Sequence, residues 1–198
     1  MEQYFKVAGM AAAVLAPFAI LSSIAMIEMD RNARQDIERT IGGKVDACLA
    51  AVERELDRHV AVLQTLSVAM DGDLPHLRRH SESVFAQMPD WLTLVLAEHD
   101  RQIFNLRLAP GDPLPPSRDP AANARVIEAG EVLVDGVVID HARLKEPFVS
   151  IRAPVTRPGG VRTPYVLIAA VRAWSITLTV KQCGVPDPKW RIGTVDAD

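Results

Sequence analysis

An uncharged run near the N-terminus is the feature that most limits how this chain can fold. From Val7 to Ile27 the sequence contains 21 residues without a charge. A helix rises about 1.5 Å per residue, so this run is about 31 Å long as a helix, enough to cross a hydrocarbon core of about 30 Å. Lys6 precedes the run and Glu28 follows it. The run therefore predicts a transmembrane helix over residues 7–27.

Two other interpretations of this run stay open. A cleaved signal peptide needs small residues just before its cleavage site, and Ser23-Ile24-Ala25 provides them. A signal core is usually shorter, at about 7–15 apolar residues, and it follows a more basic segment than one with the single Lys6. The run would otherwise be a buried helix of a soluble domain. The positive charges near its two ends do not fix which side of a membrane the rest of the chain occupies.

A helical period of apolar residues continues from this run to Met70. The row has one polar member and its residues lie three or four positions apart: Ile37, Ile41, Val45, Leu49, Val52, Leu56, His59, Leu63, Leu66 and Met70. Such a row is typical of helices that pair in a coiled coil. After Val60 the apolar face widens, which is typical of a helix packed on a sheet. We therefore expect a long membrane-proximal helix over residues 28–70, paired as a homodimer at its start and docked on its own domain at its end.

Two local features bear on this long helix. The pair Gly42-Gly43 weakens it, at about 1 kcal/mol for each glycine relative to alanine, and marks a place for a kink or a break. Cys48 lies beside Leu49 of the apolar row, so its thiol is expected to approach its mate in a homodimer. The other cysteine, Cys183, is far away in sequence, and the spacing of the two does not suit a metal. A disulfide and two free thiols both stay open.

Beyond Met70 the pattern predicts a second helix and then an antiparallel sheet. The helix begins near Asp73 and Pro75 and buries Leu77, Val84, Phe85 and Met88. Strands are expected where apolar residues run continuously or alternate: Trp91–Leu96, Gln102–Leu108, Glu131–Ile139, Phe148–Val155, Pro164–Arg172 and Trp190–Val195. Two short helices are expected at Ala121–Glu128 and Ala173–Cys183. The predicted fold class is α+β, with a transmembrane helix that continues into a long helix packed on an antiparallel sheet of five to six strands.

Composition and motifs argue against catalysis and against nucleic acid as a partner. The net charge is −3, so the chain has no basic field for a phosphate backbone. The sequence contains neither a Gly-x-Ser-x-Gly nor a His-Glu-x-x-His motif. His76 and His80 have a spacing that can hold a metal, but no third ligand lies at a matching offset. We therefore predict no catalytic residue, no metal and no cofactor.

An ordered series of short segments indicates a family. The segments are Trp91–Leu96, His99-Asp100-Arg101, Phe104–Leu108, Pro110–Pro115, Val134-Asp135-Gly136, Val149–Val155, Tyr165-Val166-Leu167, Pro188-Lys189-Trp190 and Asp196-Ala197-Asp198. Over roughly residues 50–198 the chain resembles the extracytoplasmic sensor region of bacterial transmembrane histidine kinases, of the PAS-like Cache (PDC) type. Related regions occur on diguanylate cyclases and chemoreceptors.

The resemblance implies a location and a role. A PAS-like sensor domain over residues 71–198 would face the periplasm, with the N-terminal span in the bacterial inner membrane. The kinase part would lie beyond Asp198, so we expect the sensor domain to be truncated at its C-terminal end. The protein would bind a small ligand and pass a conformational change through the membrane. Two alternatives stay open: the sensor of a diguanylate cyclase or chemoreceptor, and a membrane-anchored structural protein that oligomerises without a ligand.

Strand alternation supplies a candidate ligand site. On the second strand Asn105 and Arg107 share a face with Ile103, because alternate side chains of a strand point to the same side. On the strand that begins at Phe148, Ser150 and Arg152 share the face of that phenylalanine. The opposite faces of both strands are apolar and are expected to bury against the long helix.

The proposed face would lie under the proline-rich loop at residues 110–120, where Cache-like sensors hold small ligands. Two arginines with an amide and a hydroxyl suit a carboxylate, because a guanidinium group binds it through two parallel hydrogen bonds. Tyr165 and Trp91 would supply the walls of the site. The other interpretation stays open, namely that this face is solvated and its arginines only keep it soluble.

Overall fold

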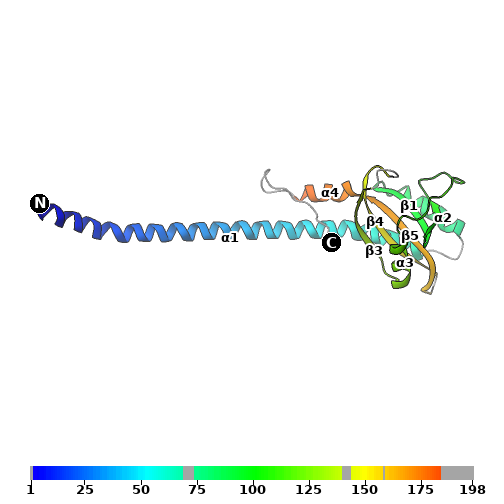
Figure 1. The fold of residues 1–198 in the computed structure, drawn as a ribbon, viewed down its shortest axis with the longest axis horizontal. Helices are drawn as coiled ribbons and strands as arrows, with labels where there is room; N and C mark the ends of the chain where they lie inside the picture. The colour runs from blue at the N-terminus through cyan, green and yellow to red at the C-terminus, as the bar shows by residue number, and fades with distance from the viewer. Residues whose placement is uncertain (1, 69–73, 140–143, 158, 184–198) are drawn as a thin grey trace. The chain divides into compact units, whose positions relative to one another are not determined.

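The computed structural model describes residues 2–68, 74–139, 144–157 and 159–183, and it describes side chains from residue 21 on, except residues 23 and 24. The chain divides into two compact units, Met1–Ala47 and Cys48–Asp198. One helix, α1 (Glu2–Val68), contributes to both of them (Figure 1).

In the part of the chain whose side chains are described, none of the helices combines the length and the apolar content needed to cross a membrane. Most of the transmembrane helix predicted at residues 7–27 lies outside that part.

The helical period of the sequence corresponds to one continuous helix. α1 passes through Gly42-Gly43 without interruption, so the helix does not break there. In the second unit its side chains divide into a covered and a solvent-facing side. Leu63 and Leu66 are fully buried, whereas Leu49 is 57% exposed.

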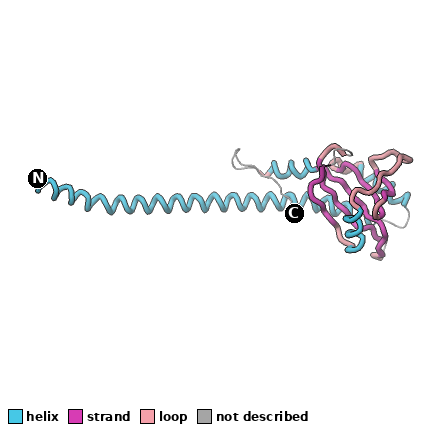
Figure 2. Tube along the Cα trace, in the orientation of Figure 1, coloured by secondary structure: helices cyan, strands magenta, loops and turns pink. Residues whose placement is uncertain are grey.

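Five antiparallel strands form one sheet in the second unit (Figure 2). They are β1 (Trp91–Glu98), β2 (Arg101–Asn105), β3 (Leu133–Ile139), β4 (Pro147–Arg157) and β5 (Val161–Arg172). Their order across the sheet is β2-β1-β5-β4-β3. The predicted antiparallel sheet is thus confirmed, and the further strand predicted at residues 190–195 lies outside the described residues.

Three shorter helices accompany the sheet: α2 (Leu74–Phe85), α3 (Pro120–Ala129) and α4 (Ala173–Gln182). The ends of α3 follow from local sequence. The Asp119 side chain accepts a hydrogen bond from the Ala122 amide at 2.9 Å, and Pro120 opens the first turn. Gly130 ends the helix in the left-handed conformation, at a φ of 74°, which glycine adopts without strain.

The strand order forces one segment to cross the sheet. β2 lies at one edge and β3 at the other, so the crossover segment (residues 106–132) runs from edge to edge. It consists of the proline-rich loop and α3. Val126 of α3 packs with Val95, Ala97 and Val166, which fixes the crossover segment on one face of the sheet.

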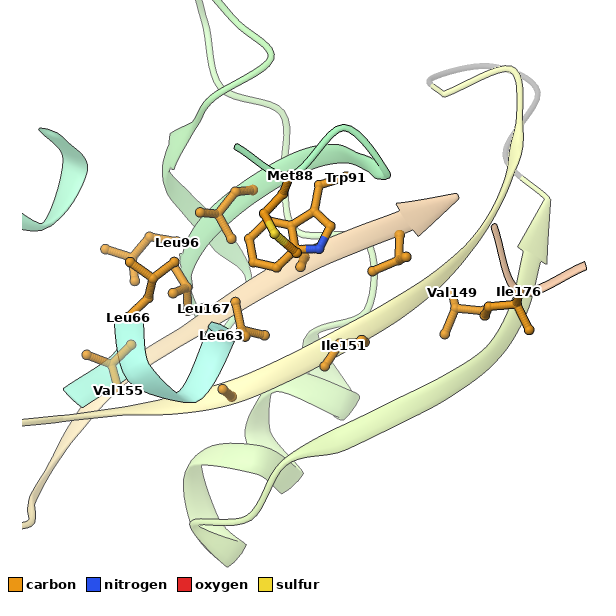
Figure 3. Close-up of a cluster of buried hydrophobic side chains, with 14 of the residues drawn as sticks. Leu63, Leu66, Met88, Trp91, Leu96, Val149, Ile151, Val155, Leu167 and Ile176 are labelled. Carbon is orange, nitrogen blue, oxygen red and sulfur yellow. The ribbon is translucent and has the colours of Figure 1, made fainter. Parts of the chain in front are cut away.

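The opposite face of the sheet carries the main hydrophobic core. Figure 3 shows Leu63 and Leu66 of α1 beside Leu96, Ile151 and Leu167 of the strands. Each of these five side chains is at most 1% exposed. Full burial of a leucine or isoleucine contributes about 1.5–3 kcal/mol, so this contact holds the end of α1 against the sheet.

Irregular pairing at several places in the sheet changes which way side chains point. In β1 the register shifts between Trp91, which pairs with Val171, and Thr93, which pairs with Ala170. A bulge of this kind adds one residue to a strand, so the residues on its two sides no longer follow simple alternation. Similar shifts occur between Leu96 and Ala97, opposite β2, and around Asp135 in β3.

Candidate functional site

A cavity of about 330 Å³ lies between the sheet and the crossover segment. Strands β1, β2, β4 and β5 form its floor, with Thr93, Val95, Gln102, Asn105, Phe148, Ser150, Arg152, Ile168 and Ala170. Its remaining walls are Arg107, Leu108, Pro115, Ser117, Arg118, Asp119 and Leu144. We call it the sheet pocket. Its size lies within the range of small-molecule sites, which begins at about 300 Å³.

A chain of hydrogen bonds fixes the polar groups at the β1–β2 end of the sheet pocket. The Thr93 hydroxyl donates to Asn105 Oδ1 at 2.7 Å, and the Arg107 amide donates to the same oxygen at 3.1 Å. Asn105 Nδ2 in turn donates to Gln102 Oε1 at 3.0 Å. The Asn105 amide therefore has one defined orientation before any ligand arrives.

Arg152 is held from two sides. Its Nε donates to Asn123 Oδ1 at 3.2 Å, and its Nη1 forms an ion pair with Asp135 Oδ2. Only 4% of the residue is exposed. Burial lowers the pKa of Arg152 from its ordinary value, with Asp119 opposing this change. An arginine starts so far above neutral pH that it stays charged.

Asn123 of α3 connects three parts of the site. Its Nδ2 donates to the His99 carbonyl and to the Ser117 hydroxyl, each at 2.7 Å. Its Oδ1 accepts the bond from Arg152, and the residue is fully buried. The crossover segment, the β1–β2 turn and β4 are thus joined by one amide. A buried side chain with all these bonds is fixed in place, and it supports Arg152, which lines the pocket.

Arg118 lines the sheet pocket, and a contact with Phe148 holds its long side chain there. It lies within the proline-rich loop, with its guanidinium carbon 5.5 Å from the centre of the Phe148 ring. This is a cation–π contact, and it keeps the guanidinium beside the pocket. Arg107 lines the same pocket from the end of β2.

The charges that line the sheet pocket are predominantly positive. Among the described residues that line it, Arg107, Arg118 and Arg152 carry a positive charge, and Asp119, which also caps α3, carries a negative one. Arg152 is paired with Asp135, and the guanidinium groups of Arg107 and Arg118 lie at the more exposed side of the pocket. Apolar groups such as Leu108 and Ile168 complete the lining. The arrangement suits a small molecule with an anionic group and an apolar part.

Four of the six predicted site residues lie together in this pocket, namely Asn105, Arg107, Ser150 and Arg152. The predicted alternation along β4 is confirmed, since Ser150 and Arg152 face the pocket and Ile151 faces the core. Ile103 differs from its prediction. It packs with the core beside Phe104, because the register shift between β1 and β2 removes it from the face of Asn105.

Trp91 and Tyr165 do not line the sheet pocket. Both pack with the hydrophobic core on the α1 side of the sheet. Simple alternation from Thr93 would place Trp91 on the pocket face, but the bulge between them turns it to the other side. Tyr165 lies two positions before Leu167 in β5, so its side chain points to the same face as that core residue. The prediction that these two residues form walls of the site is therefore not supported.

Several residues that line the pocket or support its lining were not selected from the sequence. Phe148 shares the predicted face with Ser150, so alternation alone would have found it. Arg118 lies within the loop that was expected to cover the site, but loop residues have no periodicity to indicate direction. Asn123 is a buried amide in the short helix α3, and its role depends on contacts far away in sequence.

A second polar cluster lies on the other side of the sheet. Side-chain ligand atoms of Glu55, His59 and Asp90 lie within 4.8 Å of one another. Trp91 Nε1 donates to His59 Nδ1 at 2.9 Å, so the neutral ring carries its proton on Nε2, which lies 3.3 Å from Glu55 Oε1. The guanidinium of Arg58 lies 2.7 Å from Glu55 and 3.5 Å from Asp90. The cluster thus already contains its cation, and we assign it a structural role rather than a metal site.

Comparisons with known proteins bear on the fold. No protein-family model and no curated protein matches the chain. Among solved structures, the ligand-binding domain of the Pseudomonas aeruginosa PAO1 amino acid chemoreceptor PctC, in complex with GABA, matches with a TM-score of 0.56. Its identity is 17%, over 73% of this chain and 68% of that chain.

Two further structures match less well. The ligand-binding domain of the Campylobacter jejuni chemoreceptor Tlp3, in complex with L-valine, has a TM-score of 0.48 and 10% identity, over 69% of this chain and 60% of that chain. The extracellular domain of rpHK1S-Z16, whose name places it with histidine kinases, has a TM-score of 0.42 and 11% identity, over 69% and 54%. Of the three, the similarity to PctC is the one that establishes a shared fold. The chain thus shares the fold of that PctC domain, as the sequence resemblance predicts.

Proposed function

We propose that this chain is the ligand-sensing part of a membrane-bound bacterial receptor, with its sheet domain in the periplasm. The observation that carries the proposal is the sheet pocket, where two arginines, a fixed amide and apolar side chains converge. The predicted membrane span at residues 7–27 supports the anchor, and the shared fold with a chemoreceptor domain supports the sensing role. A histidine kinase is the proposed output, with a cyclase or a chemotaxis signalling domain as the alternative.

The proposed ligand is a small carboxylate with an apolar part. Arg107 and Arg118 supply donors that match a carboxylate, and Asn105 is oriented beside them. PctC, which shares the fold, was solved in complex with GABA, a molecule that carries a carboxylate. A carboxylate agrees with the positive charge of the pocket. The apolar lining limits the size of the apolar part of the ligand.

The proposed route of the signal runs through the sheet to α1. Ser150 and Arg152 face the sheet pocket, and Ile151 between them faces the core. Leu63 and Leu66 of α1 pack in that same core (Figure 3). A ligand that shifts β4 therefore displaces groups in contact with the helix that leads toward the predicted membrane span.

The ligand proposal is tested by titrating organic acids into the full chain in detergent. We expect a small carboxylic acid to bind and to raise the melting temperature. Arg118→Ala and Arg107→Ala should each weaken its binding about 10-fold. This is at the low end of the effect of losing a charge-assisted hydrogen bond, because both arginines are partly solvated. Isothermal titration calorimetry measures the change.

Two controls make this test specific. Arg101→Ala removes an exposed arginine that pairs with Glu98 and does not line the pocket, and it should leave the affinity unchanged. The neutral amide of the same acid should bind at least 10-fold more weakly. Equal binding of acid and amide, or equal binding by wild type and both pocket variants, would reject the site.

Homodimerisation through the part of α1 at residues 37–45 is the second part of the proposal. Ile37 and Val45 are 55% and 49% exposed. With Ile41 they form a row at intervals of four residues along one side of the helix. Large apolar groups in such a row favour pairing with a second copy. The earlier expectation that Cys48 faces this partner is wrong, because Cys48 is 5% exposed and is buried in its own domain.

We expect Val45→Cys to form a disulfide-linked dimer in membranes after mild oxidation, in a background with Cys48→Ser and Cys183→Ser. The thiol would sit in the seam, where the two helices approach each other. Ala47→Cys is the matched control, since Ala47 is exposed, lies two positions after Val45 and does not belong to the apolar row. Equal crosslinking at both positions, or at neither, would contradict the pairing. Non-reducing gel electrophoresis gives the result.

A further inference from the structure

The only two cysteines of the sequence meet in the folded domain. Cys48 lies on α1, and Cys183 follows directly after α4. Cys48 Sγ lies 3.9 Å from the carbonyl oxygen of Val180, and Cys183 Sγ lies 3.2 Å from that of Thr179. These two carbonyls belong to consecutive residues in the last turn of α4. Both sulfur atoms are therefore located at the same turn of one helix.

The two thiols differ in their exposure to solvent. Cys48 is buried within the hydrophobic core, whereas Cys183 is half-buried at its margin. The neighbouring Cys183 thiol raises the pKa of Cys48, and burial raises it further. In the reduced protein Cys48 is thus a protonated thiol at the same turn of α4 as Cys183. An oxidant that arrives from solvent meets Cys183 first.

We propose that Cys48 and Cys183 are a redox pair that closes into an intramolecular disulfide and fastens α4 to α1. The oxidant is a disulfide compound. The Cys183 thiolate attacks one of its sulfur atoms, forms a mixed disulfide and releases one thiol. Cys48 then loses its proton and attacks Cys183 Sγ, which releases the second thiol. Two cysteine thiols are oxidised, and one disulfide compound is reduced to two thiols.

The bond would join two helices that otherwise touch through side chains. Ile176 and Val180 of α4 pack in the core together with Cys48 and Val52 of α1. A disulfide between the two helices prevents any sliding of α4 along α1. It also closes a loop of about 135 residues, and crosslinks that close long loops restrict the unfolded chain most. The inference does not depend on the proposed function, although an extracytoplasmic location would supply an oxidising environment.

The test uses the purified full chain in detergent, treated with oxidised glutathione under native conditions. We expect both thiols to disappear from alkylation, and the intact mass to fall by two hydrogens without added glutathione. The melting temperature should rise by ~5 °C or more and return to its starting value after reduction. The single variants Cys48→Ser and Cys183→Ser should show no such rise.

The variants also report the order of the steps. Cys48→Ser should retain a mixed disulfide with glutathione on Cys183, because no second thiol can displace it. Cys183→Ser should react much more slowly, since only the buried Cys48 remains. A mixed disulfide that persists on Cys183 in the wild-type protein would overturn the proposal. So would wild-type protein that keeps two free thiols, or one that forms the bond only between two chains or only in denaturant.

Discussion

Replacement of Arg152 with alanine should lower the free energy of unfolding by about 3 kcal/mol. The substitution leaves the Asp135 carboxylate without its cation and Asn123 Oδ1 without its donor. Loss of one partner of a buried ion pair costs about 3–5 kcal/mol, because the other charge stays behind unpaired. The low end applies because the Asp135 side chain keeps 20% of its exposure and water can reach it. Urea unfolding of the full chain in detergent measures the change.

A double substitution distinguishes this explanation from a simple loss of volume. In Arg152→Met with Asp135→Leu both charges are gone, and most of the lost stability should return. Arg101→Ala removes an arginine whose side chain is 69% exposed, and it should change the free energy of unfolding far less than Arg152→Ala does, because water screens an exposed ion pair. If Arg152→Ala proves as mild as Arg101→Ala, the buried ion pair does not hold the pocket wall. The result also decides how ligand data are interpreted, since Arg152 variants would lose binding through unfolding.

Mild acid should destabilise the domain through His59. Burial lowers the pKa of His59 from its ordinary value of 6.5, and Arg58 lowers it further, while Glu55 and Asp90 oppose this. The unfolded chain therefore binds the proton at a higher pH than the folded domain does. Stability is complete above about pH 6.5 and falls as the pH drops through the lower pKa of the folded state. Protonation also places a hydrogen on Nδ1, where Trp91 Nε1 now donates, and a buried donor left unpaired costs about 1–3 kcal/mol.

His59→Asn is the matched variant for this effect. Its side-chain oxygen can take the position of Nδ1 as acceptor for Trp91, but it does not titrate. We expect the melting temperature of the wild type to fall more than that of His59→Asn between about pH 6.5 and 5. The pKa of Glu55 is lowered by its hydrogen bond to Arg58, so the stability it contributes is lost only below its ordinary value of 4.5. If the melting temperatures of wild type and variant fall in parallel between about pH 6.5 and 5, His59 does not govern the loss of stability.

The sequence alone determines the elements whose causes are local. The apolar row of α1 predicts a helix that widens its buried face after Val60, and Leu63 and Leu66 are buried as that pattern requires. Asp119 and Pro120 begin α3. Alternation along β4 separates Ser150 and Arg152 from Ile151, because side chains of a regular strand alternate.

The site itself depends on tertiary structure. One inserted residue in β1 turns Trp91 from the pocket to the core, and the sequence carries no periodic sign of that bulge. Arg152, predicted as a ligand contact, is paired with Asp135, because the irregular pairing of β3 brings that carboxylate beside β4. The meeting of Cys48 with Cys183 likewise depends on α4 packing against α1. Local periodicity fixes which face a residue shares with its neighbours along the chain. Only the folded chain decides which distant charge or thiol lies opposite it, because long-range pairing follows from packing of whole elements rather than from sequence spacing.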